Sequence, residues 1–146
     1  MGTWGTGAFD NDMAADWAGD LQDAAPVDRP RLLRAALQAA VDNHHYLEHD
    51  EACAAIAAAA IVAALVPDGP PVAASYTPNF FIEGGALELP DDTTELAVRA
   101  LDRVFGEESE WHELWDEAGS LDEALLALAP IRAALSRKNE GTPPLR

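Results

Sequence analysis

The chain has 146 residues, of which 49% are apolar, and this length and composition suit one domain with a single hydrophobic core. With 26 acidic and nine basic residues, the formal net charge is -17, a field that repels phosphate backbones and anionic lipid headgroups. We therefore expect neither nucleic-acid binding nor membrane binding. A solubilising surface, a salt-rich habitat and a basic protein partner each account for this charge.

The sequence predicts a cytoplasmic protein without a membrane anchor, a leader or a disulfide. The longest apolar run, residues 52–66, is shorter than the roughly 18 to 20 residues with which a helix crosses a bilayer. Residues 1–4 contain no Lys or Arg and precede no apolar segment, so we expect neither a signal peptide nor a transit peptide. Cys53 is the single cysteine, which excludes a multi-thiolate metal site, and its alanine neighbours predict a small buried residue.

The first predicted helix begins near Asp12, since Asp10 or Asn11 is a suitable N-cap, and it ends before Pro26. Residues spaced four apart share one face of a helix. The apolar face of this helix therefore consists of Met13, Trp17 and Leu21.

The second predicted helix follows Asp28 as its N-cap and has Pro30 in its first turn, where a missing N–H costs no hydrogen bond. It ends near residues 43–46. Its inward stripe consists of Leu33, Leu37, Ala40 and Val41.

The third predicted helix has an acidic first turn, which suits the partial positive charge of a helix N-terminus, and it continues through residues 52–66. That run is apolar on every side. Because its alanines allow neighbouring backbones to approach closely, we expect it to be the central and most buried element of the fold.

Residues 67–90 break the helical pattern with several prolines and glycines. Short pieces of strand-like composition and a turn at Gly84 and Gly85 make this long loop compatible with a small hairpin. Long loops in compact domains are often functional. Three aromatic residues are therefore either binding residues or plugs that close the loop onto the helices: Tyr76, Phe80 and Phe81.

Three more helices are predicted after Pro90. Each begins at a residue type that caps helix N-termini: Asp92, Ser109 and Ser120. Gly106 and Gly119 end the first two of these helices, and Pro130 is expected to kink or restart the third.

Together these elements predict an all-α fold, an irregular or orthogonal bundle of five to six helices around the central Ala-rich helix. The Pro- and Gly-rich loop at 67–90 is its one long connection. Residues 1–136 are expected to form the single helical domain, and the polar residues 137–146 a frayed tail. We expect a monomer or a weak homodimer.

A Trp-Gly-x-Gly-x-Phe-x-Asn-Asp pattern occupies residues 4–12 and is followed by Ala15, Asp16 and Trp17. On these residues the chain resembles domain of unknown function 4259, a bacterial family whose members open with this signature and a helix carrying Ala-x-Asp-Trp. The Ala-rich helix and residues 97–104 and 113–115 are similar in character, so the resemblance spans most of the chain. It implies no known activity.

This N-terminal motif has a structural and a functional interpretation. In the structural one, Trp4 and Phe9 are apolar plugs on the bundle, while Asp10 or Asn11 caps the first helix. In the functional one, the motif lines a recognition patch or a cation site, since hard cations favour oxygen ligands. The residues of that binding patch are Trp4, Asp10, Asn11, Asp12, Asp16 and Trp17.

Three histidines, His44, His45 and His49, lie close together in the sequence. If the helix were continuous there, His45 and His49 would share a face as half of a metal site, with Glu48 or His112 as a third ligand. The helix boundary predicted near residues 43–46 instead makes them surface histidines at helix ends. We expect no cofactor.

The sequence favours two functions from different classes. The first is a non-enzymatic acidic binding protein, for example an inhibitor or immunity-type protein for a basic partner, because the chain has no recognisable catalytic motif and a strongly negative charge. The alternative is a small metal-binding protein or metal-dependent enzyme that uses the histidine cluster. A role in a larger assembly would instead expose the aromatic residues of the 67–90 loop together.

Overall fold

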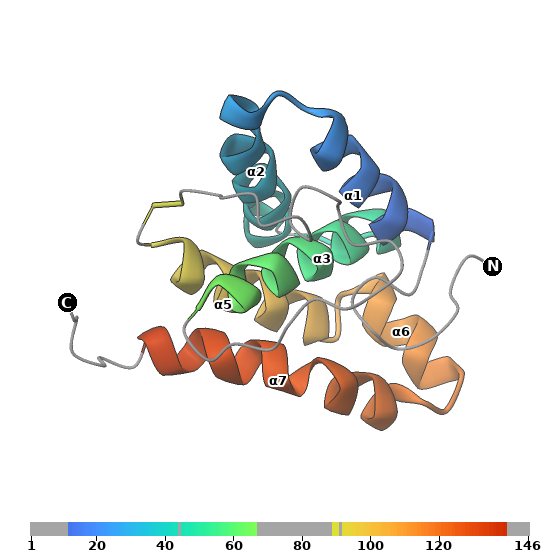
Figure 1. The fold of residues 1–146 in the computed structure, drawn as a ribbon. Helices are drawn as coiled ribbons and strands as arrows, with labels where there is room; N and C mark the ends of the chain where they lie inside the picture. The colour runs from blue at the N-terminus through green and yellow to red at the C-terminus, as the bar shows by residue number, and fades with distance from the viewer. Residues whose placement is uncertain (1–11, 44, 67–88, 91, 140–146) are drawn as a thin grey trace.

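The computed structural model describes residues 12–43, 45–66, 89–90 and 92–139. These residues form six α-helices, one 3-10 turn and no strand (Figure 1). The predicted all-α class is therefore confirmed for the described part of the chain. The predicted hairpin and its aromatic residues Tyr76, Phe80 and Phe81 lie outside the described residues, so that prediction stays open.

Helix α3 (His49–Leu65) is the centre of the bundle, as its composition predicts. Eleven of its 17 residues are buried, and they lie on every side of the helix. It contacts each of the other five described α-helices, which Figure 1 shows arranged around it. Within the described ranges no helix is long and apolar enough to cross a membrane.

Helices α1 (Asp12–Asp23) and α2 (Arg29–Asp42) pack on α3 and are joined through the turn η1 (Pro26–Asp28). Arg29 ties the two together, because its Nε and Nη2 donate to the carbonyls of Leu21 and Gln22 at 3.1 and 2.8 Å. These carbonyls belong to the last turn of α1, where a positive charge is favourable, and the Leu21 carbonyl also accepts from the Ala24 N–H at 3.3 Å.

The buried face of α1 differs from the predicted one. Its fully buried residues are Ala14, Ala18 and Leu21, whereas Met13 and Trp17 are only partly buried. The buried face of α1 is therefore rotated away from Met13 and Trp17, the two large side chains that the sequence had placed on it together with Leu21. The alanines of α3 leave a narrow space between the two helices, so small residues of α1 fill the contact and the ring of Trp17 lies at its flank.

The predicted capping residues Asp28, Asp92 and Ser109 occupy N-cap positions, but none of their side chains bonds the helix backbone. Asp28 instead pairs with Arg31 at 2.9 Å, and Asp92 pairs with Arg34 at 2.9 Å. A guanidinium is a stronger donor for a carboxylate than a neutral backbone N–H, so the arginines capture these two side chains.

The C-terminal half consists of α5 (Thr93–Phe105), α6 (Glu110–Glu117) and α7 (Leu121–Asn139). Gly106 follows α5 as predicted, and Gly119 between α6 and α7 has φ +76°, a left-handed conformation that favours glycine. Helix α7 continues through Pro130, so the predicted restart does not occur. Pro130 and Leu126 are both exposed, so the Leu126 carbonyl that loses its donor to the proline is not sealed in the core.

Replacement of Ala59 by Asp is expected to unfold the protein. Ala59 is fully buried in α3, and an unpaired carboxylate there costs several kcal/mol, a large part of the about 5–15 kcal/mol that stabilises a typical domain. Thermal melting followed by circular dichroism measures the effect. The control Ala35→Asp adds the same charge at an exposed position of α2 and should melt close to wild type. A wild-type melt of Ala59→Asp would contradict the central position of α3.

Candidate functional site

The loop between α2 and α3 lies against the link between α5 and α6. Leu47 and Ser109 form an isolated parallel bridge. The Leu47 N–H donates to the Glu108 carbonyl at 2.9 Å, and the Glu110 N–H donates to the Leu47 carbonyl at 2.8 Å. These two bonds fix the start of α6 beside the start of α3.

Arg103 of α5 fastens both loops. Its Nε donates to the Asn43 carbonyl at 3.2 Å, and its Nη1 donates to the Glu108 carbonyl at 3.0 Å. Its Nη2 donates to the His45 carbonyl at 2.6 Å and to the Asn43 Oδ1 at 3.3 Å. A planar guanidinium offers five donors in a fixed arrangement, so one side chain holds three separate points of two loops.

Helix α3 takes its N-terminal cap from α6. Its own N-cap residue, Glu48, makes no side-chain cap bond. The His49 N–H donates instead to Glu110 Oε1 at 2.9 Å. A carboxylate from a neighbouring helix thus lies at the positive end of the α3 dipole, which stabilises both helices at their contact.

Tyr46 lies among carboxylates of α6. Its hydroxyl donates to Glu113 Oε1 at 2.6 Å. This hydrogen bond, together with partial desolvation and the negative charges of Glu113, Glu110 and Glu117, raises the pKa of Tyr46 to about 12. The three glutamates are spaced so that they share one face of α6, and Leu114 lies on the same face. We call Tyr46, Glu110, Glu113, Leu114 and Glu117 the Tyr46 site.

The Tyr46 site is open to solvent at its centre. Tyr46 is 42% exposed and Leu114 is 44% exposed. Glu113 and Glu117 are exposed, while Glu110 is half-buried at the cap of α3. An exposed aromatic ring and an exposed aliphatic side chain therefore lie inside a group of negative charges.

The carboxylates around α6 have no basic residue near them in the sequence. Residues 104–131 contain no Lys or Arg and eight acidic residues: Glu107, Glu108, Glu110, Glu113, Asp116, Glu117, Asp122 and Glu123. The three ion pairs among the described residues all lie elsewhere, at Asp28, Asp92 and Asp102. Among the described residues, no ion pair therefore neutralises a carboxylate of this surface.

The predicted histidine cluster is not assembled. Helix α2 ends at Asp42 and α3 begins at His49, so the continuous helix that would align His45 with His49 does not exist. His45 is exposed, and His112 Nδ1 lies 2.9 Å from the Phe105 carbonyl. His44 lies outside the described residues. Where the structure describes the chain, no three His, Cys, Asp or Glu side chains are placed to hold a metal ion.

Cys53 is a buried neighbour of His49, with its Sγ 3.4 Å from the imidazole Nε2. Burial, followed by the charges of Asp50 and Glu110, raises the pKa of the Cys53 thiol to about 12. The thiol therefore keeps its proton near neutral pH, which agrees with the small buried residue predicted from its alanine neighbours.

Of the predicted N-terminal patch, the structure describes the side chains of Asp16 and Trp17. Asp16 is exposed, and Trp17 packs partly buried against the core. Trp4, Asp10 and Asn11 lie outside the described residues, as does the side chain of Asp12. Whether these residues form one patch stays a prediction.

Sequence reasoning missed Tyr46 and Arg103. The partner of Tyr46 is 67 residues away, and the Asn43 partner of Arg103 is 60 residues away, so no local pattern indicates either contact. The sequence contains one weak signal for the importance of Arg103. Arg103 is the last basic residue before a stretch of 28 residues, 104–131, that contains none, which marks the boundary of the acidic surface.

Comparison with known proteins places the chain in a family without an assigned activity. The family model described as domain of unknown function (DUF4259) matches residues 2–127. This range includes the N-terminal signature, α1 to α6 and the start of α7. No curated protein and no solved structure matches the chain.

Replacement of Arg103 by Ala is expected to lower the free energy of unfolding by about 2–4 kcal/mol, because several loop carbonyls lose a charged donor. Chemical denaturation measures this loss. Hydrogen exchange at the Leu47 and Glu110 N–H groups should become faster as well. Arg99→Ala, at an exposed position of the same helix, is the control. Equal effects of the two substitutions would show that Arg103 does not fasten the loops.

Replacement of Glu113 by Gln is expected to move the pKa of Tyr46 from about 12 back toward its ordinary value of 10.0. In the wild type, an unfolded tyrosine ionises first as the pH rises from about 10 to about 12, so folding loses stability across that window. Tyrosinate absorbance in a Tyr76→Phe background reports Tyr46 alone. Glu95→Gln on α5 is the matched control, and a Tyr46 pKa unmoved by Glu113→Gln would rule out the hydrogen bond as its cause.

Proposed function

We propose that this chain, which belongs to the domain of unknown function 4259 family, is a non-enzymatic binding protein for a basic protein partner. The observation that carries the proposal is the Tyr46 site, an exposed aromatic ring among three carboxylates on a surface whose sequence holds no Lys or Arg from residue 104 to 131. An inhibitor or immunity-type protein, which covers a cationic surface of its target, is the form of this function that the charge favours.

The Tyr46 site has the groups that recognise a lysine or arginine side chain. A cation attracts the face of an aromatic ring, and a carboxylate accepts charge-assisted hydrogen bonds, two at once from arginine. Glu113 uses one oxygen for the Tyr46 hydroxyl, but a carboxylate has two oxygens and about four acceptor positions. The same hydrogen bond also fixes the orientation of the ring.

The site is held in place before any partner arrives. Helix α6 has only eight residues, and a helix of this length is not stable alone in water. The backbone bridge between Leu47 and Ser109, the Arg103 bonds and the Glu110 cap hold it against α3 and α5. Binding to a site that is already ordered loses less conformational entropy, which favours affinity.

The acidic surface also supports fast association. Seven of the eight carboxylates between residues 104 and 131 are exposed, and the whole chain carries a formal charge of -17. Such a field steers a basic partner toward the site and raises the association rate at low salt. The effect weakens as salt shortens the range of electrostatic attraction to about 8 Å at physiological ionic strength.

The two other hypotheses stay predictions. Metal binding by His44, His45 and His49 has no support from the described side chains, of which His45 and His49 lie on different elements. Assembly through Tyr76, Phe80 and Phe81 concerns a loop outside the described residues. Neither is favoured by a specific contact.

The partner is expected to be a basic protein that the tagged chain captures from a host lysate at low salt and releases at high salt. Replacement of the three carboxylates Glu113, Asp116 and Glu117 by their amides should weaken binding to the purified partner by about tenfold or more, mainly through the association rate. Replacement of Asp20, Asp23 and Asp42 by Asn removes the same charge from exposed positions of α1 and α2. Binding kinetics on a sensor surface measures both.

Two results would count against the proposal. Recovery of no basic protein at either salt concentration would remove the expected partner. Equal losses of affinity in the two triple variants would show that net charge alone determines binding and that the Tyr46 site has no special part in it.

A further inference from the structure

Helix α6 buries fewer residues than any other α-helix that the structure describes. Trp111 is its only buried residue, whereas each of the other five helices has at least three. Toward the α2–α3 loop it is joined by the two backbone bonds of Leu47 and by the Glu113 carboxylate, which accepts from the Tyr46 hydroxyl. Each of these bonds replaces a bond to water, so its net contribution to stability is modest. The position of α6 on the bundle is therefore the least stable of the six.

The Ser109 hydroxyl lowers the stability of this position further. Ser109 immediately precedes α6 and is 0% exposed. Its Oγ has no hydrogen-bond partner among the described residues, and it makes no cap bond to α6. A buried hydroxyl of this kind loses its hydrogen bonds to water and gains none in return, which is a cost that the folded state carries.

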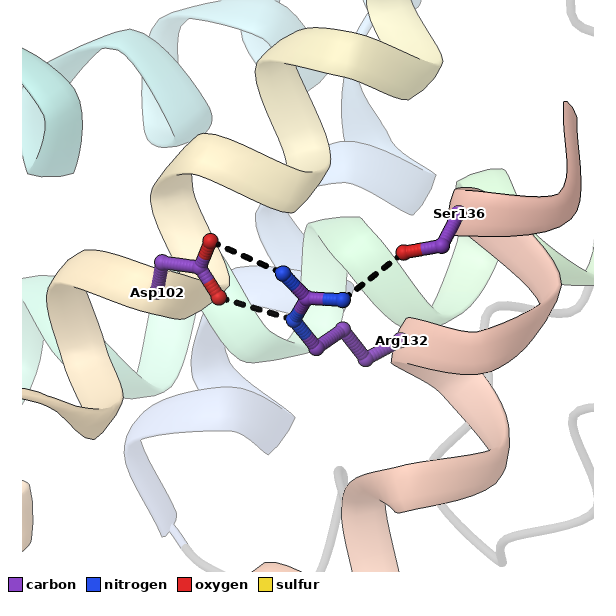
Figure 2. Close-up of polar contacts among 3 residues, drawn as sticks. All are labelled: Asp102, Arg132 and Ser136. Atoms are coloured by element: carbon purple, nitrogen blue, oxygen red, sulfur yellow. Dashed lines mark hydrogen bonds and ion pairs between the residues drawn. The ribbon is translucent and has the colours of Figure 1, made fainter. Parts of the chain in front are cut away.

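Other hydroxyls at the helix contacts do have partners. Ser136 Oγ accepts from Arg132 Nη1 at 2.8 Å, and the same guanidinium donates to both oxygens of Asp102 on α5 (Figure 2). Thr93 Oγ1 accepts from Arg34 Nη1 at 2.7 Å. Among the described residues, Ser109 Oγ is the one buried side-chain atom without a partner. The unpaired hydroxyl thus lies at the start of the least buried helix.

Glycines lie between α6 and both neighbouring helices. Gly106 follows α5, and Gly119 precedes α7 with φ +76°. Hinges of moving elements are a few such loop residues that absorb a change in backbone dihedrals. Movement of α6 as a unit therefore needs no change within the neighbouring helices.

We propose that α6 opens as a unit from the α2–α3 loop about Gly106 and Gly119, and that Ser109 sets how often it opens. In the open state the Ser109 hydroxyl bonds to water, which offsets part of the cost of breaking the other contacts. Opening also separates Tyr46 from Glu113, so the Tyr46 site exists only in the closed state.

The opening makes the Tyr46 site a two-state element. A basic partner that binds the assembled site holds α6 closed, because a ligand shifts the equilibrium toward the state that binds it. This coupling rests on the proposed function, whereas the opening itself does not.

Hydrogen exchange of the full chain measures the opening. The Leu47 and Glu110 N–H groups form bonds that break when α6 leaves the loop, so both should exchange faster than the Ala59 N–H in the centre of α3. Ser109→Ala removes the unpaired hydroxyl and is expected to slow exchange at Leu47 and Glu110 by about tenfold. Ser136→Ala, the matched control, removes a bonded hydroxyl from α7 and should not slow either group.

Two results would overturn the opening. Exchange at Leu47 and Glu110 that is as slow as at Ala59 would show that α6 opens only when the whole chain unfolds. Unchanged or faster exchange in Ser109→Ala would show that the hydroxyl is bonded in the closed state.

An oligoarginine peptide tests the coupling. At about ten times its dissociation constant, the peptide should slow exchange at Leu47 and Glu110 by about tenfold, since it binds only the closed state. Peptide binding that leaves both rates unchanged would overturn the coupling and leave the affinity for basic partners intact. A peptide that does not bind at all would contradict the proposed function, and the effect of Ser109→Ala would stand by itself.

Discussion

The fold depends on the burial of α3 on all of its sides. Its buried surface is mostly alanine, and so small a side chain lets five other helices approach the same axis. This constraint selects small residues on the facing helices, such as Ala14 and Ala18 on α1 and Ala97 and Ala100 on α5. Larger side chains then pack around the edges of these contacts, as Trp17 does.

The burial of α3 on all of its sides also determines where charged residues lie in the fold. The core is almost entirely apolar, and an unpaired carboxylate inside it would be costly, so none of the described acidic residues is fully buried. Five arginines make contacts within the chain, on backbone carbonyls or in ion pairs with Asp28, Asp92 and Asp102. Arg103, the one nearest to α6, bonds carbonyls and an amide oxygen and leaves the carboxylates of α6 unneutralised. The Tyr46 site is thus a consequence of how few basic residues the chain has and where each one is engaged.

Local patterns in the sequence predicted most of the fold. Apolar periodicity, glycines and the Ala-rich run indicated the helices, the central position of α3 and the ends of α5 and α6, because these depend on neighbours a few residues away. The candidate site depends on contacts such as Tyr46 to Glu113 and Arg103 to Asn43, which the fold creates between distant segments. The N-cap positions of Asp28 and Asp92 were predicted correctly, because they depend on local sequence. Their side-chain partners were not predicted: both carboxylates pair with an arginine and not with the helix backbone.

A comparison of α5 with α7 shows that exposed apolar residues on a helix are not a requirement of this bundle. Both helices pack on the same core and on each other. The exposed residues of α5 are all charged: Glu95, Arg99 and Asp102. Those of α7 beyond its first turn are all apolar among the residues whose side chains the structure describes. A helix that only completes the core gains nothing from an exposed leucine, because that side chain stays in water.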